Sequence, residues 1–170
     1  MIEKLVSGGQ TGVDQAALQI AINFKILHGG WCPKGRLAEN GVIPDIYFLK
    51  ETDSNDVSVR TKHNIRDSDG TLILIPNNNT DITDGTIFTI KEVKEQSKPH
   101  LIISLSQDKE DAVESIVEWS QSNDIKILNI AGPRESQAPG IHHLSLIFLE
   151  KLIRKLIQTR FKDLKGINKW

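Results

Sequence analysis

The chain has 170 residues, of which 38% are hydrophobic and 25% are charged, and its formal net charge at pH 7 is −1. This composition is typical of one folded domain, and the near-neutral charge balance provides no basic field that would attract nucleic acid. No apolar run approaches the roughly 20 residues of a membrane-spanning helix, and the single cysteine, Cys32, cannot form an internal disulfide. We therefore expect a cytoplasmic protein with no nucleic-acid or membrane partner, with one ligand-binding domain over 1–160 and a basic tail at 161–170.

Short apolar segments alternate along the chain with segments whose apolar residues recur at helical spacing. Strands are expected at 5–6, 71–75, 101–105 and 125–130. Helices are expected at about 13–24, 54–66, 85–97, 109–122 and 141–160, the second of them capped by Ser54. The runs at 71–75 and 101–105 are almost entirely apolar, which favours central positions in a parallel sheet, whereas 125–130 alternates more and is expected nearer an edge. This pattern predicts a three-layer α/β/α fold with a mainly parallel sheet of about five or more strands.

Two parts of the chain are less regular. Glycines and prolines interrupt residues 29–53, so no element is assigned there. The helix expected at 141–160 is apolar on more than one face, so one stripe can cover the sheet while the second needs another partner. Burial within the domain and a subunit interface are both open for that second stripe.

The loop that follows the first strand has the composition of an anion-binding turn. It opens a helix, and its glycines let backbone amides converge where the helix start adds unpaired N–H groups. The pattern matches neither the Walker A motif nor the dinucleotide fingerprint, and a plain strand-to-helix turn is the alternative. The candidate ligand-binding residues in this loop are Gly8, Gly9, Gln10, Thr11 and Gly12.

Two later loops and several cations complete the candidate site. Residues 83–86 and 131–136 each follow a strand, and in the second of these loops Ser136 can donate a hydroxyl. Loops at the carboxyl edge of one parallel sheet face a common crevice in which such sheets bind ligands. Simple turns and solvated surface charges are the alternatives. The candidates in these loops are Gly85, Thr86, Gly132 and Arg134, with Lys34, Arg36 and Arg60 as counter-charges for an acidic ligand.

Metal ligands and paired carboxylates are poorly represented. None of the five histidines has zinc-type spacing with Cys32, so no metal bound directly by the protein is expected. Asp67 and Asp69 form a pair of carboxylates that suits catalysis or metal binding, although capping and turn roles are commoner for aspartates at a helix end. Arg60, Asn64 and Asp67 recur at helical spacing and are expected to share one polar face.

Four segments of the sequence together resemble the molybdenum cofactor carrier family. In chain order they are SGGQTGVD at 7–14, GGWCPKGR at 29–36, RDSD at 66–69 and AGPRES at 131–136. The family is a branch of the Rossmann-like superfamily that includes the Lonely Guy phosphoribohydrolases and the Smf-type DNA-processing proteins, and the resemblance covers about residues 4–150. It implies a Rossmann-like fold, a homo-oligomer (dimer or tetramer) and a nucleotide-like or molybdopterin ligand whose phosphate lies near the first loop.

The sequence departs from that family and its relatives in the second loop. Asp84 stands where the family usually has a second glycine, and Thr89 stands where the related phosphoribohydrolases have a catalytic glutamate. The resemblance thus predicts a non-enzymatic binding or carrier protein for molybdenum cofactor (molybdopterin) or a similar small phosphorylated heterocycle. One alternative is an enzyme that acts on nucleoside monophosphates, with Asp67, Asp69 or Glu92 as the acid or base. The other is a nucleotide-sensing module that relays binding to a partner protein.

Overall fold

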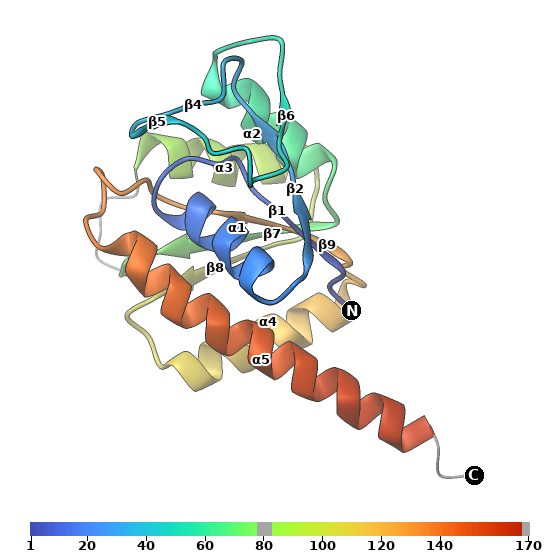
Figure 1. Ribbon diagram of the computed structural model, residues 1–170. Coiled ribbons are helices and arrows are strands. Elements are labelled where there is room, and N and C mark those ends of the chain that lie inside the picture. The colour runs from blue at the N-terminus through green and yellow to red at the C-terminus, as the bar shows by residue number, and fades with distance from the viewer. Residues whose placement is uncertain (78–82, 168–170) are drawn as a thin grey trace.

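The computed structural model of the protein describes residues 1–77 and 83–167, with side chains described up to residue 161. Its centre is a five-stranded sheet in which every pair of neighbouring strands is parallel (Figure 1). The strands, in spatial order, are β2 (Leu27–Gly29), β1 (Lys4–Val6), β9 (Ile127–Ala131), β7 (Gly70–Ile75) and β8 (His100–Ser104). The mainly parallel sheet expected from the sequence is therefore confirmed.

Two strand positions differ from the expectation. β9 lies in the middle of the sheet between β1 and β7, whereas β8, with its apolar run, lies at an edge. β7 is buried along its whole length, but Ile102 of β8 is 38% exposed. The predicted positions of these two strands were wrong. Crossover connections set the order of strands in a sheet, whereas the hydrophobicity of a single strand indicates only which of its faces are covered.

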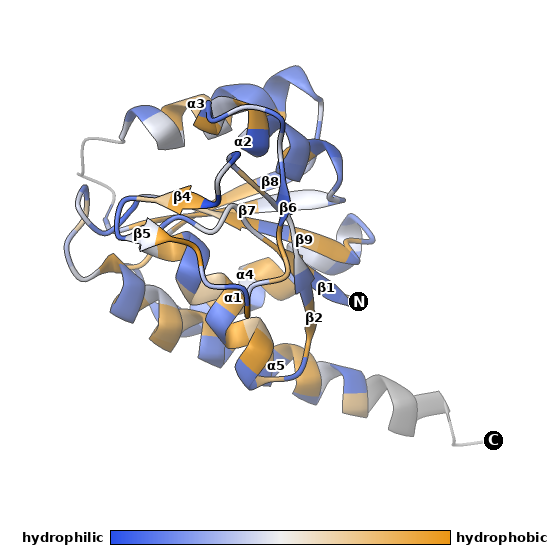
Figure 2. Ribbon diagram, turned by 45° about the horizontal axis from the view of Figure 1, so that its top comes forward, coloured by the Kyte–Doolittle hydropathy of each residue, from blue (hydrophilic) through white to orange (hydrophobic). Residues whose placement is uncertain are grey.

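Helices cover both faces of the sheet and complete the predicted three layers (Figure 2). α1 (Val13–Asn23), α4 (Lys109–Ser122) and α5 (Ile141–Ile167) pack on one face, and α2 (Val57–Arg66) and α3 (Asp84–Glu95) pack on the other. α2 begins three residues later than expected, because Asp56 is its N-cap and accepts a hydrogen bond of 2.8 Å from the amide of Ser58. Ser54 instead accepts a hydrogen bond from the amide of Asp56.

The last helix is longer than the sequence pattern predicted. α5 continues to Ile167, so residues 161–167 of the expected tail are helical, while 168–170 lie outside the described residues. Phe148 and Leu152 are buried in the main core, whereas Leu144 and Ile147 are each 42% exposed. One apolar stripe thus belongs to the domain core and a second remains at the surface. No helix in the described part of the chain is long and apolar enough to cross a membrane.

Residues 30–53, which follow β2, form two pairs of short strands that pack on α1 at Leu18. β3 (Trp31–Cys32) pairs with β6 (Lys50–Glu51), and β4 (Leu37–Ala38) forms a hairpin with β5 (Gly41–Val42). A small second core seats this segment and consists of Leu18, Cys32, Ile43 and Leu49. The side chains of this short segment face different partners, so its hydrophobic residues follow neither a helical nor a strand period. This is why the sequence pattern predicted no element here.

Candidate functional site

Loops from the carboxyl ends of β1 and β9, with the start of α3, surround a crevice of about 360 Å³. Parallel sheets bind ligands at this edge because loops from neighbouring strands meet there. Of the predicted site residues, those that line the crevice are Gln10, Arg60, Gly85, Thr86, Gly132 and Arg134. Asp14, at the start of α1, lies beside them. The sequence segments that suggested an anion site are therefore neighbours in space.

A buried ion pair forms one wall of the crevice. Nη1 of Arg60 lies 3.0 Å from Oδ2 of Asp14, and the two side chains are only 15% and 4% exposed. Burial raises the pKa of the Asp14 carboxyl above its ordinary 3.8, and the Arg60 charge opposes this rise. A Cβ on Gly8 would lie 1.7 Å from Nη1 of Arg60, so this glycine makes room for the guanidinium. Nε of Arg60 is buried and has no hydrogen-bond partner within the described residues.

The first loop divides its backbone amides into two sets. The amide of Gln10 donates to Oδ2 of Asp14 at 3.3 Å, and the amide of Thr11 donates to Oε1 of Gln10 at 3.0 Å. The other set belongs to Gly8, Gly9 and Gly12, which are buried residues whose amides have no hydrogen-bond partner in the described part of the chain. Buried backbone N–H groups are rarely left unpaired in native proteins. Gly12 lines a second cavity, of about 700 Å³, whereas Gly8 and Gly9 line neither that cavity nor the crevice.

Two of these glycines also have structural requirements of their own. Gly9 has φ +78°, and a Cβ there would lie 2.6 Å from Cδ1 of Leu49 in the small second core. Gly12 has φ +75°, and its Cβ would lie 2.4 Å from the carbonyl oxygen of Pro133 in the third loop. The first loop is therefore clamped between the 29–53 segment and the third loop, which holds its amides in place.

The start of α3 closes the opposite side of the crevice. Thr83 is the N-cap, and its hydroxyl accepts a hydrogen bond of 3.4 Å from the amide of Thr86. A Cβ on Gly85 would meet nothing within 4 Å, so neighbouring atoms impose no requirement for glycine at this position. The helix start adds unpaired amides and the positive end of a helix dipole to the same crevice.

Residues 5–153 match the model of the circularly permutated YpsA SLOG family. The chain belongs to this family. It is also similar to a solved structure from Syntrophus aciditrophicus, named "putative molybdenum carrier protein", with 44% sequence identity and a TM-score of 0.84. That match covers 89% of this chain and 94% of the other chain. No match was found among curated proteins. These similarities confirm both the predicted family resemblance and the Rossmann-like fold.

Two predicted cations of this SLOG-family chain lie outside the crevice. The guanidinium of Arg36 donates to the carbonyls of Ile43, Pro44, Tyr47 and Leu49, with distances from 3.0 to 3.2 Å. It therefore holds the 43–49 segment in its fold, and we do not include it in the proposed site. Lys34 lies in the same segment, where its side chain is exposed and its amide donates to the carbonyl of Ser54 at 2.9 Å.

The carboxylates considered for catalysis are engaged elsewhere. Asp67 accepts hydrogen bonds from Nε1 of Trp31 at 2.8 Å and from Nε of Arg66 at 2.6 Å. Asp69 accepts from the amide of Ile127 at 2.7 Å and precedes β7, at the edge of the sheet opposite the crevice. Glu92 accepts from Nε2 of Gln96 at 2.7 Å. None of the three is among the described residues that line the crevice.

The polar side chains predicted to share one face of α2 bind neighbouring parts of the protein. Arg60 pairs with Asp14, the Asn64 side chain bonds both the amide and the carbonyl of Trp31, and Asp67 bonds the Trp31 indole. These contacts attach α2 to the first loop and to β3. One face of a helix thereby positions the arginine that lines the crevice.

Substitution of Asp67 by asparagine is expected to alter the acid stability of the protein. Hydrogen bonds from Arg66, followed by that from Trp31, lower the pKa of Asp67 from 3.8 to about 2. A carboxyl whose pKa is lower in the folded state stabilises the fold above pH 3.8, and this contribution disappears as the pH falls through about 2. The side chain is 43% exposed, so we expect Asp67→Asn to cost only about 0.5–1 kcal/mol at pH 7.

Urea denaturation between pH 2 and pH 7 measures this effect. The free energy of unfolding of Asp67→Asn should fall less steeply below pH 4 than that of the parent. The control is Asp53→Asn, because Asp53 is exposed and its side chain has no hydrogen-bond or ion-pair partner among the described residues, and its acid slope should match that of the parent. Equal slopes for the parent and Asp67→Asn would show that the Arg66 and Trp31 contacts do not stabilise the charged form.

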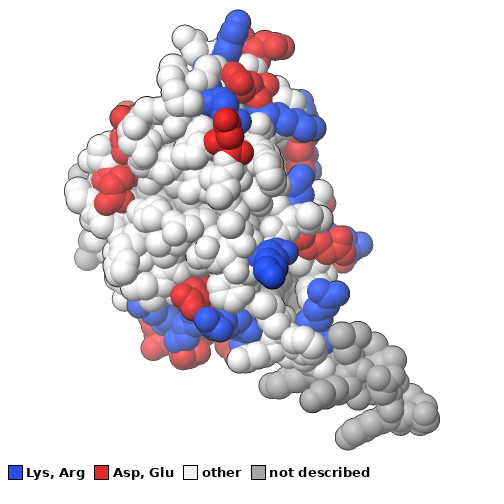
Figure 3. Space-filling view, in the orientation of Figure 1, with Lys and Arg blue, Asp and Glu red and all other residues white. Residues whose placement is uncertain are grey.

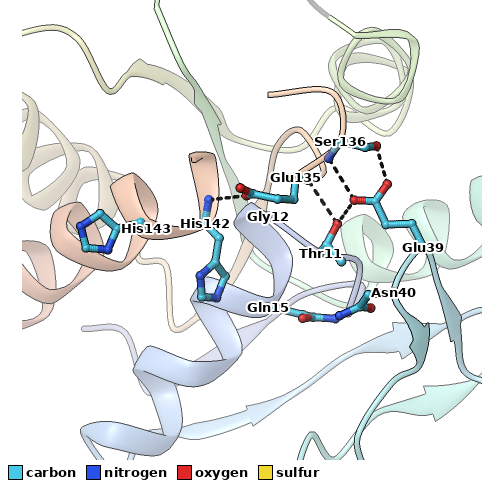
Figure 4. Close-up of a pocket in the computed structure, with 9 residues that line it drawn as sticks. All are labelled: Thr11, Gly12, Gln15, Glu39, Asn40, Glu135, Ser136, His142 and His143. Atoms are coloured by element: carbon cyan, nitrogen blue, oxygen red, sulfur yellow. Dashed lines mark hydrogen bonds between the residues drawn. The ribbon is translucent and has the colours of Figure 1, made fainter. Parts of the chain in front are cut away.

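Sequence reasoning missed Glu39, which the hairpin tip places between the first and third loops (Figure 4). Thr11 donates its hydroxyl to Oε1 of Glu39 and lines a second cavity instead of the crevice. No local pattern singled out Glu39, since it lies in the irregular 29–53 segment. A single carboxylate in such a segment has no partner at a regular spacing that would mark it as functional.

Proposed function

We propose that the protein is a non-enzymatic binding or carrier protein for molybdenum cofactor or a similar small phosphorylated heterocycle. The ligand phosphate would accept hydrogen bonds from the buried amides of Gly8, Gly9 and Gly12 and from the start of α3. Arg60 and Arg134 would supply positive charge, and the ring would occupy the rest of the crevice. The observation that carries the proposal is that residues from the first loop, α2, the start of α3 and the third loop line one crevice. The first loop beside it holds three buried glycine amides without a partner in the described chain.

The magnitudes explain why several loops have to act together. A helix terminus contributes on the order of 0.3–1 kcal/mol to an exposed anion, and a micromolar ligand needs about 8 kcal/mol. Charge-assisted hydrogen bonds contribute about 1.5–3 kcal/mol each. The amides, two arginines and burial of a flat ring can together reach that range. The described residues contain no group of three or more His, Cys, Asp or Glu side chains placed to hold a metal ion.

The site has the composition of a binder more than that of a hydrolase. Asp14 is the carboxylate of the crevice that is best placed for catalysis, but it is held in the ion pair with Arg60. Thr89 occupies the place of the catalytic glutamate that related phosphoribohydrolases use, and its hydroxyl donates to the carbonyl of Gly85 at 2.9 Å. The name of the Syntrophus aciditrophicus relative agrees with a carrier role.

The same proposal includes a cytoplasmic homo-oligomer, as a dimer or tetramer. The face of the molecule over α1 and the β4–β5 hairpin carries few charged side chains (Figure 3). Leu37 and Val42 of the hairpin are 55% and 68% exposed, and the exposed Leu144 and Ile147 lie on α5. Apolar surface of this kind without charge is typical of subunit contacts.

Native mass spectrometry of the freshly purified protein, followed by calorimetric titration with AMP, tests the carrier proposal. We expect a bound mass that matches molybdopterin or a nucleoside monophosphate, and saturable AMP binding. Arg134→Ala should weaken AMP binding roughly tenfold or more, because it removes a charged donor that lines the crevice and also pairs with Glu39. Lys34→Ala removes the same charge outside the crevice and should leave the affinity unchanged.

Two outcomes contradict the proposal. Sustained release of adenine from AMP would establish an enzyme in place of a carrier. A protein with no bound heterocycle and no saturable AMP binding would show that the first loop is only a turn.

A further inference from the structure

A side chain of the protein occupies a cluster of donors outside the crevice. The hairpin β4–β5 carries Glu39 at its tip, and the Glu39 carboxylate points between the first and third loops (Figure 4). The hydroxyls of Thr11 and Ser136 both donate to it, the amide of Ser136 donates to its Oε1 at 3.0 Å, and Nε of Arg134 lies 3.6 Å from its Oε2. Two hydroxyls, one amide and one guanidinium therefore converge on a single anionic group.

This donor set is suited to negative charge. Desolvation acts to raise the pKa of Glu39, but the hydrogen bonds from Ser136 and Thr11 outweigh it and lower the pKa below its ordinary 4.5. Hydroxyls, backbone amides and arginine are also the donors that proteins use for the oxygens of a phosphate group. The two carboxylate oxygens of Glu39 therefore take the place that two oxygens of a phosphate group could take.

An open cavity of about 700 Å³ adjoins the cluster and shares three of its residues, Thr11, Glu39 and Ser136. The other acidic side chain at the cavity, Glu135, accepts hydrogen bonds from the amides of Gly140 and His142 at 2.6 and 3.0 Å and caps the start of α5. The imidazole rings of His142 and His143 line the cavity and have no hydrogen-bond partner in the described residues. Once Glu39 is withdrawn, the remaining acidic side chain at the cavity is Glu135, whose carboxylate is already occupied by the two amides at the start of α5.

The base of the hairpin packs on the small second core through Ala38, whereas its tip has few contacts. Its strands are only two residues long, Leu37 and Val42 are more than half exposed, and a Cβ on Gly41 would meet nothing within 4 Å. Apart from the Glu39 carboxylate, the tip is held by the hydrogen bond from the Glu39 amide to Oε1 of Gln10 at 2.9 Å. An incoming anion therefore competes mainly with one tethered carboxylate.

We propose that Thr11, Ser136 and Arg134 form a second binding site for a tetrahedral oxyanion such as a phosphate group, and that Glu39 is its tethered occupant. An oxyanion that binds there displaces the carboxylate and releases the hairpin tip. This site shares Arg134 with the crevice, but the expected binding of inorganic phosphate at Thr11 and Ser136 does not depend on the ligand proposed for the crevice. The oxyanion comes either from a free inorganic ion or from a phosphate monoester whose organic part fills the adjoining cavity.

Titration calorimetry of Glu39→Ala with inorganic phosphate and with AMP tests this site. Removing the tethered competitor should tighten phosphate binding by at least about tenfold relative to the parent protein. Equal gains for phosphate and AMP would identify the free ion as the ligand, and a larger gain for AMP would identify a monoester. Glu51→Ala is the matched control, because Glu51 is a carboxylate of the same segment that accepts from the amide of Gly35 at 2.7 Å. It should leave phosphate binding as in the parent.

The double variant Glu39→Ala/Ser136→Ala assigns the gain to this cluster, since it should lose most of it. If Glu39→Ala is folded by circular dichroism and binds neither anion more tightly than the parent, Glu39 is only a structural tie and the proposal is overturned. A gain that persists in the double variant overturns it as well. If Glu39→Ala does not fold, Glu39→Gln replaces it, because glutamine keeps the side-chain size and removes the charge. Glu39→Gln should also bind phosphate more tightly than the parent. If it does not, the proposal is overturned. Loss of AMP binding at the crevice does not alter the expected gain for inorganic phosphate.

Discussion

Gly12→Ala is expected to lower the free energy of unfolding by roughly 3 kcal/mol or more, from backbone strain and overpacking of about 1–3 kcal/mol each. Gly12 has φ +75°, a conformation that costs an L-residue energy. The added methyl group would also lie 2.4 Å from the carbonyl oxygen of Pro133, which is backbone and cannot rotate away. To relieve the contact, the third loop has to move off the first, and the hydrogen bond from the Val13 amide to Pro133, at 3.3 Å, is lost with it.

Gly85→Ala is the matched control for this substitution. It is another glycine at a helix start, but its Cβ would meet nothing within 4 Å. Alanine there should stabilise the protein by about 0.4–1 kcal/mol, since it restricts the unfolded chain and favours helix. Urea denaturation followed by circular dichroism measures both variants. A loss below about 1 kcal/mol for Gly12→Ala would show that the third loop is not seated on this glycine.

Arg60→Ala is expected to destabilise the protein by about 3 kcal/mol at pH 7, because it leaves a buried carboxylate without its partner. The Asp14 side chain is 4% exposed, and Arg60 is its only ion-pair partner in the described residues. The variant also removes a guanidinium from the crevice, so AMP binding should weaken as well. Lys62→Ala, at an exposed position of the same helix, should change stability by less than about 0.5 kcal/mol.

The loss in Arg60→Ala should depend on pH with a defined sign. The pKa of Asp14 in the folded protein is already raised above 3.8 by burial, and loss of the Arg60 charge raises it further. The folded state then binds a proton more readily than the unfolded state, so stability falls as the pH rises through the folded pKa. The destabilisation should therefore be largest near neutral pH and shrink in acid.

A second substitution at Asp14 separates charge from packing. Asp14→Asn/Arg60→Ala removes the stranded carboxylate and should recover much of the stability that Arg60→Ala loses at pH 7. A double variant as unstable as Arg60→Ala would mean that Arg60 acts through its packing against Gly8 and not through its charge.

Local features of the sequence were sufficient for much of the fold. Helix α4 has the predicted bounds, since Asp108 caps it and its apolar residues keep a regular helical spacing. The run at 71–75 is a buried strand, and the glycine-rich segment at 7–12 is a strand-to-helix loop. Each of these depends on residues a few positions apart, whose backbone preferences and periodicity are visible in a short window.

Other features depend on residues that meet only after folding. Asp14 and Arg60 are 46 positions apart, and Glu39 and Ser136 are 97 apart, so no spacing rule pairs them. Arg36 resembles a ligand-binding cation in sequence, but its guanidinium meets four carbonyls of a loop that curls around it. A charged side chain has the same local signature whether it meets a ligand, a carboxylate or the backbone.

The chain by itself thus determined a parallel α/β domain with glycine loops at the ends of its strands, because these follow from local periodicity and backbone freedom. The tertiary structure decided the order of the strands, which cations face the crevice and which donors the protein's own carboxylates already occupy. Those outcomes depend on distances between segments far apart in sequence, and the long-range packing of helices on the sheet sets these distances.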